Sequence, residues 1–120
     1  MQKNTVVLGA SENAERYSNM AVKKLVAHKH PVTAISNKEG VINDIKIIKE
    51  NPLLNDVDTV TLYLNPLNQK PYYDYILSLQ PKRIIFNPGT ENEELEKLAE
   101  AKGIKTMEAC TLVLLSTNQY

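Results

Sequence analysis

The sequence is poor in the residues that build cross-linked or metal-stabilised proteins. Among its 120 residues there is one cysteine, Cys110, and there are two histidines, His28 and His30. A single cysteine excludes an internal disulfide, and two histidines give no spacing typical of a metal site. We therefore expect a protein of the reducing cytoplasm that holds no metal ion.

The sequence also lacks an excess of one charge and any long hydrophobic run. Fourteen basic and fourteen acidic residues cancel, which argues against nucleic acid or an anionic membrane as a partner. The first ten residues contain only a brief apolar stretch, which is too short for a membrane span and unlike a signal peptide. A chain of this length fits one domain over residues 1–120.

What the sequence does contain is a pattern that often begins a nucleotide-binding α/β domain. The apolar run Val6–Leu8 leads into Gly9-Ala10-Ser11, and a helical pattern follows from about Glu15 to His28. Such a turn brings backbone close to a phosphate, and the helix that follows offers unpaired N–H groups. The full G-x-G-x-x-G fingerprint is absent because Ser11 and Ala14 occupy the second and third glycine places.

Strands and helices alternate along the rest of the chain. The helix after the first loop has an apolar stripe, and a second stripe runs through Tyr72–Leu79. Strands are expected at about Val32–Ser36, Asp58–Leu64, Arg83–Phe86 and Ile104–Met107. The pattern predicts a parallel, doubly wound α/β sheet of about five strands in the order 3-2-1-4-5.

Four details complete the expected architecture. Tyr17, Met20, Ala21, Leu25 and Val26 form the stripe of the first helix, and Thr90-Glu91-Asn92-Glu93 is a capping box for the helix that ends at Gly103. Residues 39–56 fit either a short helix or a short irregular strand. The tail, Ala109–Tyr120, is expected to cover one end of the core with its run Leu112–Leu115.

In a doubly wound sheet the carboxyl ends of the strands share one edge, so loops distant in sequence meet there. The expected binding residues in these loops are Gly9, Ala10, Ser11, Asn13, Arg16, Asn37, Lys38, Leu64, Asn65, Pro66, Asn87, Pro88 and Gly89. Amides, two cations and rigid prolines suit phosphates and an adenine edge. They indicate a binding site rather than a reaction centre.

The end of the second strand bears on which nucleotide is bound. Domains that hold NAD usually place Asp or Glu there, to hydrogen-bond a ribose, whereas this chain has Asn37-Lys38. Lys38 suits a phosphate better than it suits a bare ribose. A tight turn alone would also account for Gly9, and a solvated loop charge would account for Lys38.

Four stretches together resemble the stand-alone CoA-binding domain family, which is similar to the amino-terminal CoA-binding domain of the succinyl-CoA synthetase alpha subunit. They are Val6–Ser18, Ile35-Ser36-Asn37-Lys38, Asp58–Leu64 and Gly103-Ile104-Lys105. The resemblance implies a Rossmann-like, three-layer fold that binds coenzyme A or an acyl-CoA. It places the pyrophosphate region at Gly9-Ala10-Ser11, a CoA phosphate at Lys38, and the pantetheine arm beside Asn87-Pro88-Gly89.

The chain departs from the family pattern in two respects. Many relatives have Asn-Pro-Lys where this chain has Ser36-Asn37-Lys38, and the synthetase's phosphorylated histidine belongs to a second domain that this chain does not contain. Ligase activity is therefore not expected. Helix-end placement gives His28 and His30 a structural role, and apolar neighbours give Cys110 a buried one.

Two other functions are compatible with the pattern. The first is a small NADP-dependent oxidoreductase or a redox-sensing NAD(P) module, although no acidic residue follows the second strand and no proton donor lies near Asn87 in the sequence. The second is an interaction subunit that has lost ligand binding. A homodimer through the tail, or a protein partner that the sequence does not identify, is also open.

Overall fold

The strands form one sheet of seven, and the structure, a computed structural model, describes residues 2–120. The strands are β1 (Thr5–Leu8), β2 (Val32–Ile35), β3 (Gly40–Ile42), β4 (Ile45–Ile48), β5 (Thr59–Leu62), β6 (Arg83–Phe86) and β7 (Lys105–Glu108). Their order across the sheet is β3-β4-β2-β1-β5-β6-β7. All neighbouring pairs are parallel except β3 with β4.

The predicted doubly wound α/β fold is confirmed, with two strands more than expected. Both additions lie in residues 39–56, where β3 and β4 form an antiparallel hairpin. Counted along the chain without β3, the parallel strands have the order 3-2-1-4-5-6, which is that of dinucleotide-binding domains. The strand at Thr59–Leu62 is thus the fourth parallel strand, because Ile45–Ile48 takes the place beyond β2.

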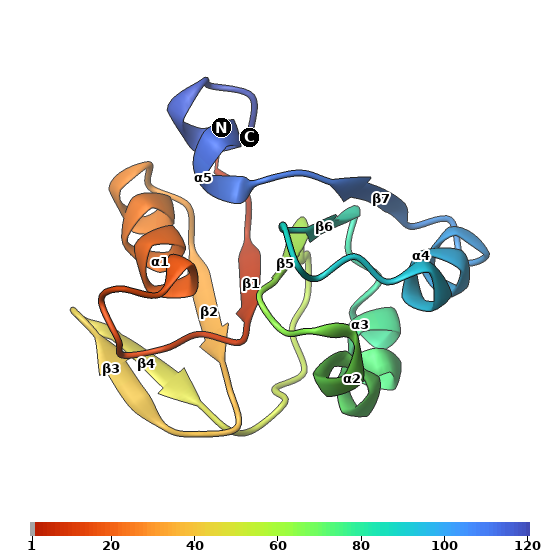
Figure 1. The fold of residues 1–120 in the computed structure, drawn as a ribbon, viewed down its shortest axis with the longest axis horizontal. Coiled ribbons are helices and arrows are strands. Elements are labelled where there is room, and N and C mark those ends of the chain that lie inside the picture. The colour runs from red at the N-terminus through yellow and green to blue at the C-terminus, as the bar shows by residue number, and fades with distance from the viewer. Residues whose placement is uncertain (1) are drawn as a thin grey trace.

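The helices cover both faces of the sheet (Figure 1). They are α1 (Tyr17–Ala27), α2 (Pro66–Gln69), α3 (Tyr73–Leu79), α4 (Glu93–Glu100) and α5 (Thr111–Ser116), with a 3₁₀ turn at Lys70–Tyr72. On one side lie α1 and α5, and on the other lie α2, α3 and α4. The layers are therefore helix, sheet and helix, as the resemblance implies.

Strand alternation divides the core into two parts. In β1, Val6 and Leu8 pack with Leu95 and other residues of the α3 and α4 side, whereas Val7 packs with Leu25 on the α1 side. All three β1 residues are at most 1% exposed. A central strand that is buried on both faces is an uninterrupted apolar run, which is why this stretch is visible in the sequence.

The inward face of α1 differs from the predicted stripe. Tyr17 is 71% exposed, and Met20 and Val26 are also exposed. The buried face is Ser18, Asn19, Ala21, Val22 and Leu25. Ala21 and Leu25 are buried as predicted, whereas the prediction was wrong for Tyr17, Met20 and Val26. The buried face is displaced by about one residue of helical phase, because the polar Asn19 is buried and binds the loop before the helix.

The start of α4 also needs correction. The helix begins at Glu93, and its N-cap is Asn92, whose side chain accepts a hydrogen bond from the Leu95 N–H. Thr90 instead donates from its hydroxyl to the Asn87 carbonyl. The capping-box prediction was therefore wrong by two residues, since Asn is as good a cap as Thr and lies closer to the apolar stripe.

Candidate functional site

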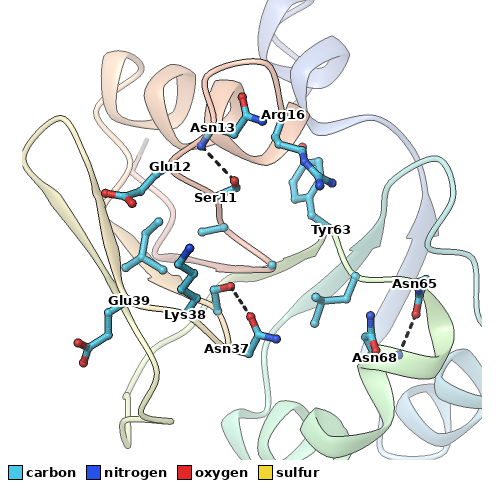
Figure 2. Close-up of a pocket in the computed structure, with 15 residues that line it drawn as sticks. Ser11, Glu12, Asn13, Arg16, Asn37, Lys38, Glu39, Tyr63, Asn65 and Asn68 are labelled. Carbon is cyan, nitrogen blue, oxygen red and sulfur yellow. Dashed lines mark hydrogen bonds between the residues drawn. The ribbon is translucent and has the colours of Figure 1, made fainter.

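A polar cavity of about 660 Å³ opens at the edge where the carboxyl ends of the strands meet (Figure 2). It lies between three loops, which follow β1, β2 and β5. Its lining residues are Gly9, Ala10, Ser11, Glu12, Asn13, Arg16, Ser36, Asn37, Lys38, Glu39, Ile47, Tyr63, Leu64, Asn65 and Asn68. The strand order reverses between β1 and β5, so this is the crevice where doubly wound sheets bind ligands.

A second, narrower cavity of about 220 Å³ adjoins the first. The two share Gly9, Ser11, Arg16, Tyr63 and Asn65 as lining residues. The second adds Tyr17, Ser18, Pro88, Gly89 and Thr90, so it runs between the start of α1 and the loop after β6. Together the two cavities form a branched cleft.

Gly9 is required by the close approach of two loops. Its φ is +95°, and a Cβ built on it would lie 3.0 Å from the carbonyl carbon and oxygen of Tyr63. The N–H groups of Gly9 and Ala10 both donate to the Ile35 carbonyl, at 2.9 and 3.2 Å. These two N–H groups are therefore used within the fold, so a phosphate would meet the N–H groups further along the loop and in α1.

The loop from Ser11 to Arg16 is shaped by its own side chains. The Asn13 N–H donates to the Ser11 hydroxyl, and the Glu15 N–H donates to the Asn13 side-chain carbonyl. From α1, the Asn19 side-chain amide donates to the Ser11 carbonyl at 2.9 Å. The loop thus has a fixed course over the first turn of the helix.

The amino end of α1 has no cap of its own. Arg16 is the N-cap residue, it makes no side-chain capping bond, and the first turn contains no acidic residue. The first N–H groups of a helix have no partner within the helix, and they carry its positive dipole end. Tyr17 and Ser18 bring this end to the second cavity, which makes it suitable for an anion.

Two cations and two carboxylates line the first cavity. Figure 2 shows Lys38 extending from the loop after β2 toward the first loop, with Arg16 on the far side. Within residues 2–120, neither Lys38 nor Arg16 takes part in an ion pair. Glu12 is held at the rim, because its Oε2 accepts a hydrogen bond from the Val41 N–H of the edge strand at 2.9 Å.

The cleft brings together most of the residues expected from the sequence. Nine line the first cavity, namely Gly9, Ala10, Ser11, Asn13, Arg16, Asn37, Lys38, Leu64 and Asn65, and Pro88 and Gly89 line the second. Pro66 and Asn87 line neither. Pro66 is the first residue of α2, where its fixed φ suits a helix start.

The Asn87 side chain makes its hydrogen bonds inside the protein. It is 2% exposed, and its amide donates to the Thr61 hydroxyl and the Leu62 carbonyl. Its side-chain carbonyl accepts from the Thr111 N–H at 2.8 Å. Asn87 therefore fastens β5 and α5 to the end of β6, and its neighbours Pro88 and Gly89 reach the cleft in its place.

Tyr63 is the main cleft residue that the sequence pattern did not predict. It lines both cavities. Its hydroxyl is buried and has no hydrogen-bond partner, and burial raises the pKa of this phenol well above its usual range. The signal that could have found it is its position as the first residue after β5. Glu12, Ser36, Glu39 and Asn68 also line the first cavity and were not predicted.

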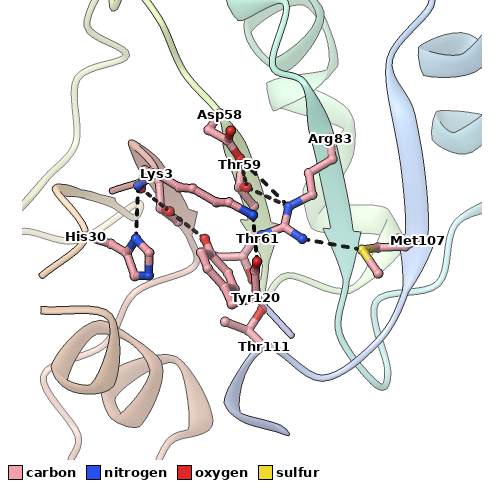
Figure 3. A network of polar contacts seen from close by, with 10 residues as sticks. Lys3, His30, Asp58, Thr59, Thr61, Arg83, Met107, Thr111 and Tyr120 are labelled. Atoms are coloured by element: carbon pink, nitrogen blue, oxygen red, sulfur yellow. Dashed lines mark hydrogen bonds and ion pairs between the residues drawn. The ribbon is translucent and has the colours of Figure 1, made fainter. Parts of the chain in front are cut away.

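Polar residues also gather at the opposite edge of the sheet, around the last residue of the chain (Figure 3). The Arg83 guanidinium lies 4.4 Å from the centre of the Tyr120 ring, and the His30 ring lies 4.9 Å from it. His30 accepts a hydrogen bond from the Lys3 N–H at its Nδ1. Burial, reinforced by nearby positive charge, lowers the pKa of His30. This cluster fastens the tail to the start of the strands and has no part in the cleft.

Two kinds of feature are absent from residues 2–120. No group of three or more His, Cys, Asp or Glu side chains in this range is arranged to hold a metal ion. No helix in the same range has both the length and the apolar character needed to cross a membrane.

The fold and the cleft are those of the Rossmann-like class. Within that class, the chain belongs to the CoA binding domain family, whose sequence pattern matches residues 3–116. A comparison with curated proteins finds no match.

Solved structures with the same fold include one close relative. A crystal structure of an uncharacterized protein is 48% identical, with a TM-score of 0.97 over 100% of this chain and 99% of that one. A hypothetical protein from Pyrococcus horikoshii OT3 is 22% identical, with a TM-score of 0.87 over 97% of this chain and 83% of its own. Aspartate dehydrogenase from Thermotoga maritima is 14% identical, with a TM-score of 0.56 over 91% of this chain and 45% of its own. The last two likenesses concern the fold alone.

Proposed function

We propose that this protein binds coenzyme A or an acyl-CoA in the branched cleft and breaks no bond in it. Membership of the CoA binding domain family supports the ligand. The observation that carries the proposal is the uncapped amino end of α1 at the second cavity, beside Arg16, which lines both cavities, while Lys38 lines the first. Helix N-terminal N–H groups and cations are the groups that bind phosphates.

The two cavities match the two halves of the ligand. The phosphorylated adenosine half fits the larger cavity, where Lys38 would pair with the 3′-phosphate. The diphosphate would lie over the first turn of α1, beside Arg16. The pantetheine arm would then enter the narrower cavity, between Tyr17 and Pro88.

Tyr63 supports binding rather than acid–base chemistry. Tyr63 lines both cavities, yet its hydroxyl is buried, and its pKa is raised. A general acid must reach the reacting atom, and it works best when its pKa lies near the working pH. Four of the other side chains that line the first cavity are the amides of Asn13, Asn37, Asn65 and Asn68, which are neither acids nor bases near neutral pH.

Calorimetric titration with coenzyme A, dephospho-CoA and NADPH tests the proposal. Wild-type protein should bind coenzyme A more tightly than the other two. Lys38→Ala should weaken the binding of coenzyme A by about 1–3 kcal/mol, or roughly 5- to 150-fold in Kd, as expected for the loss of a charge-assisted contact. The same substitution should leave the Kd for dephospho-CoA, which has no 3′-phosphate, almost unchanged.

Lys46→Ala is the matched control, because Lys46 is an exposed lysine on β4 that lines neither cavity. It should change neither affinity. Equal affinity of wild-type protein for coenzyme A and dephospho-CoA would reject the role of Lys38. Absence of coenzyme A binding, or tighter binding of NADPH, would reject the proposed function.

A further inference from the structure

Gln69, the last residue of α2, forms hydrogen bonds from the protein interior to two loops of the cleft. Its side chain is fully buried, with 0% exposed. Its Nε2 donates to the Leu64 carbonyl and to the Thr90 carbonyl, both at 2.8 Å. Leu64 lines the first cavity and Thr90 lines the second, so one carboxamide bridges the loops that follow β5 and β6.

The orientation of this carboxamide is fixed by a second one. The Gln69 Oε1 accepts a hydrogen bond at 2.8 Å from the side-chain amide of Asn92, which also donates to the Tyr73 hydroxyl. The side-chain oxygen of Asn92 accepts a hydrogen bond from the Leu95 N–H and so caps α4. Reversing Gln69 would place its NH₂ group against an NH₂ group and its oxygen against two carbonyls, so only one orientation satisfies all partners.

The strands of the sheet do not pair the two bridged loops. The last paired residues of β5 and β6 are Leu62 and Phe86, so the loops that follow them lie beyond the ladder. Asn87 ties the start of the second loop to the Leu62 carbonyl, and Gln69 makes a further connection beyond it, to the Leu64 and Thr90 carbonyls. Thr90 lines the narrower cavity, and Leu64 lies between its lining residues Tyr63 and Asn65, so this bridge connects two walls of that cavity.

We propose that Gln69 is a positioning residue that sets the width of the narrower cavity and thereby the affinity for the pantetheine arm; this rests on the proposed function. Gln69 touches no ligand in this scheme. It acts through the backbone of Leu64 and Thr90. Ten of the fifteen residues that line the larger cavity belong to the loops after β1 and β2, with which Gln69 makes no hydrogen bond; its bond to Leu64 reaches only the wall formed by the loop after β5.

The test compares two ligands on one variant. Gln69→Glu keeps the size of the side chain and the acceptor for Asn92, but it removes both donors to the loops. We expect its Kd for coenzyme A to rise about tenfold or more, because binding would then have to restore the loop geometry that the two hydrogen bonds hold in the free protein. The Kd for adenosine 3′,5′-bisphosphate, which lacks the pantetheine arm, should stay within about twofold of wild type.

Two control variants separate positioning from general destabilisation. Leu79→Ala removes a core side chain of α3 that lines neither cavity, and it should leave the ratio of the two Kd values unchanged even though it lowers the unfolding temperature. Gln119→Glu makes the same chemical change at an exposed position and should change neither Kd. Should Gln69→Glu fail to fold, Asn92→Asp keeps the α4 cap, removes the bond to Gln69, and should shift the ratio in the same direction.

An equal rise of both Kd values in Gln69→Glu, or no rise in either, would overturn the positioning role. Hydrogen exchange without ligand keeps the two proposals distinguishable. Amides of Leu64, Asn65 and residues 89–91 should exchange faster in Gln69→Glu than in Leu79→Ala at matched stability. Unchanged exchange would overturn the inference, whereas faster exchange in a protein that does not bind coenzyme A would overturn only the proposed function.

Discussion

Gly9→Ala should destabilise the protein through two separable effects. The first is backbone strain, because an alanine at φ +95° costs about 1–2 kcal/mol. The second is steric, because the new Cβ would lie 3.0 Å from the Tyr63 backbone and 3.1 Å from the Leu64 side chain. Backbone at the end of a central strand yields little, so this overlap should add about 1–3 kcal/mol.

The combined loss is about 2–5 kcal/mol, a large share of the stability of a small domain. For a chain of this size it corresponds to a fall in Tm of roughly 10 °C or more. Guanidinium denaturation followed by circular dichroism measures the change directly. The m-value should stay constant if only the folded state is affected.

Gly89→Ala is the control, because Gly89 has a φ of +92° but nothing within 4 Å of the added Cβ. Its free energy of unfolding should fall only by the cost of the backbone strain, about 1–2 kcal/mol. The difference between the two variants isolates the contact between the first loop and the end of β5. Equal losses would refute the argument that this close approach is what requires a glycine at position 9.

Three other perturbations each test a single feature of the structure. Arg16→Asp gives α1 the capping acceptor that it lacks, so denaturation should show a fold about 0.5–1 kcal/mol more stable. Calorimetry should show weaker binding of coenzyme A. Lower stability would contradict the uncapped helix end. Asn92→Ala should cost about 1–3 kcal/mol, whereas Glu93→Ala, at the position a capping box would use, should cost under about 0.5 kcal/mol; the reverse ranking would restore the capping box. The pKa of His30 is lowered on folding, so the unfolded chain binds the proton more readily, and Tm should fall as pH drops below about 6.5. His30→Gln should flatten that dependence, as Tm at pH 5 and pH 7 would show.

Much of the fold could be predicted from the sequence, because strands buried on both faces are uninterrupted apolar runs. Val6–Leu8 and Ile84–Phe86 are fully or almost fully buried, and each stands between clear turn residues. The hairpin of β3 and β4 was missed for the opposite reason. It lies at the edge of the sheet in strands of three and four residues, with Val41 and Lys46 exposed, so its alternation is short and weak.

The errors in the helices have a common cause, which is that polar side chains make tertiary hydrogen bonds. Asn19 turns inward on α1 to hold the Ser11 carbonyl, and Asn92 caps α4 while it binds Gln69. A hydrophobic stripe or a capping motif records only local preferences. The partners of these amides lie on other elements, and the sequence does not show which.

The cleft was predictable to the extent that topology alone determines it. Parallel strands bring Ser11, Lys38 and Asn65 to one edge wherever their loops happen to point. Direction within the loops was not predictable. Asn87 looked like a ligand-facing amide, yet three internal hydrogen bonds keep it buried.

The central claim is that a phosphorylated adenine carrier binds at the carboxyl edge of this sheet. Titration of ¹⁵N-labelled protein with coenzyme A, followed through the backbone amide signals, tests both the ligand and the place. The largest shifts should fall in residues 11–18, at Lys38 and in residues 63–65, with few near Tyr120. No shifts at saturating coenzyme A, or shifts centred on the cluster around Tyr120 and Arg83, would contradict the account.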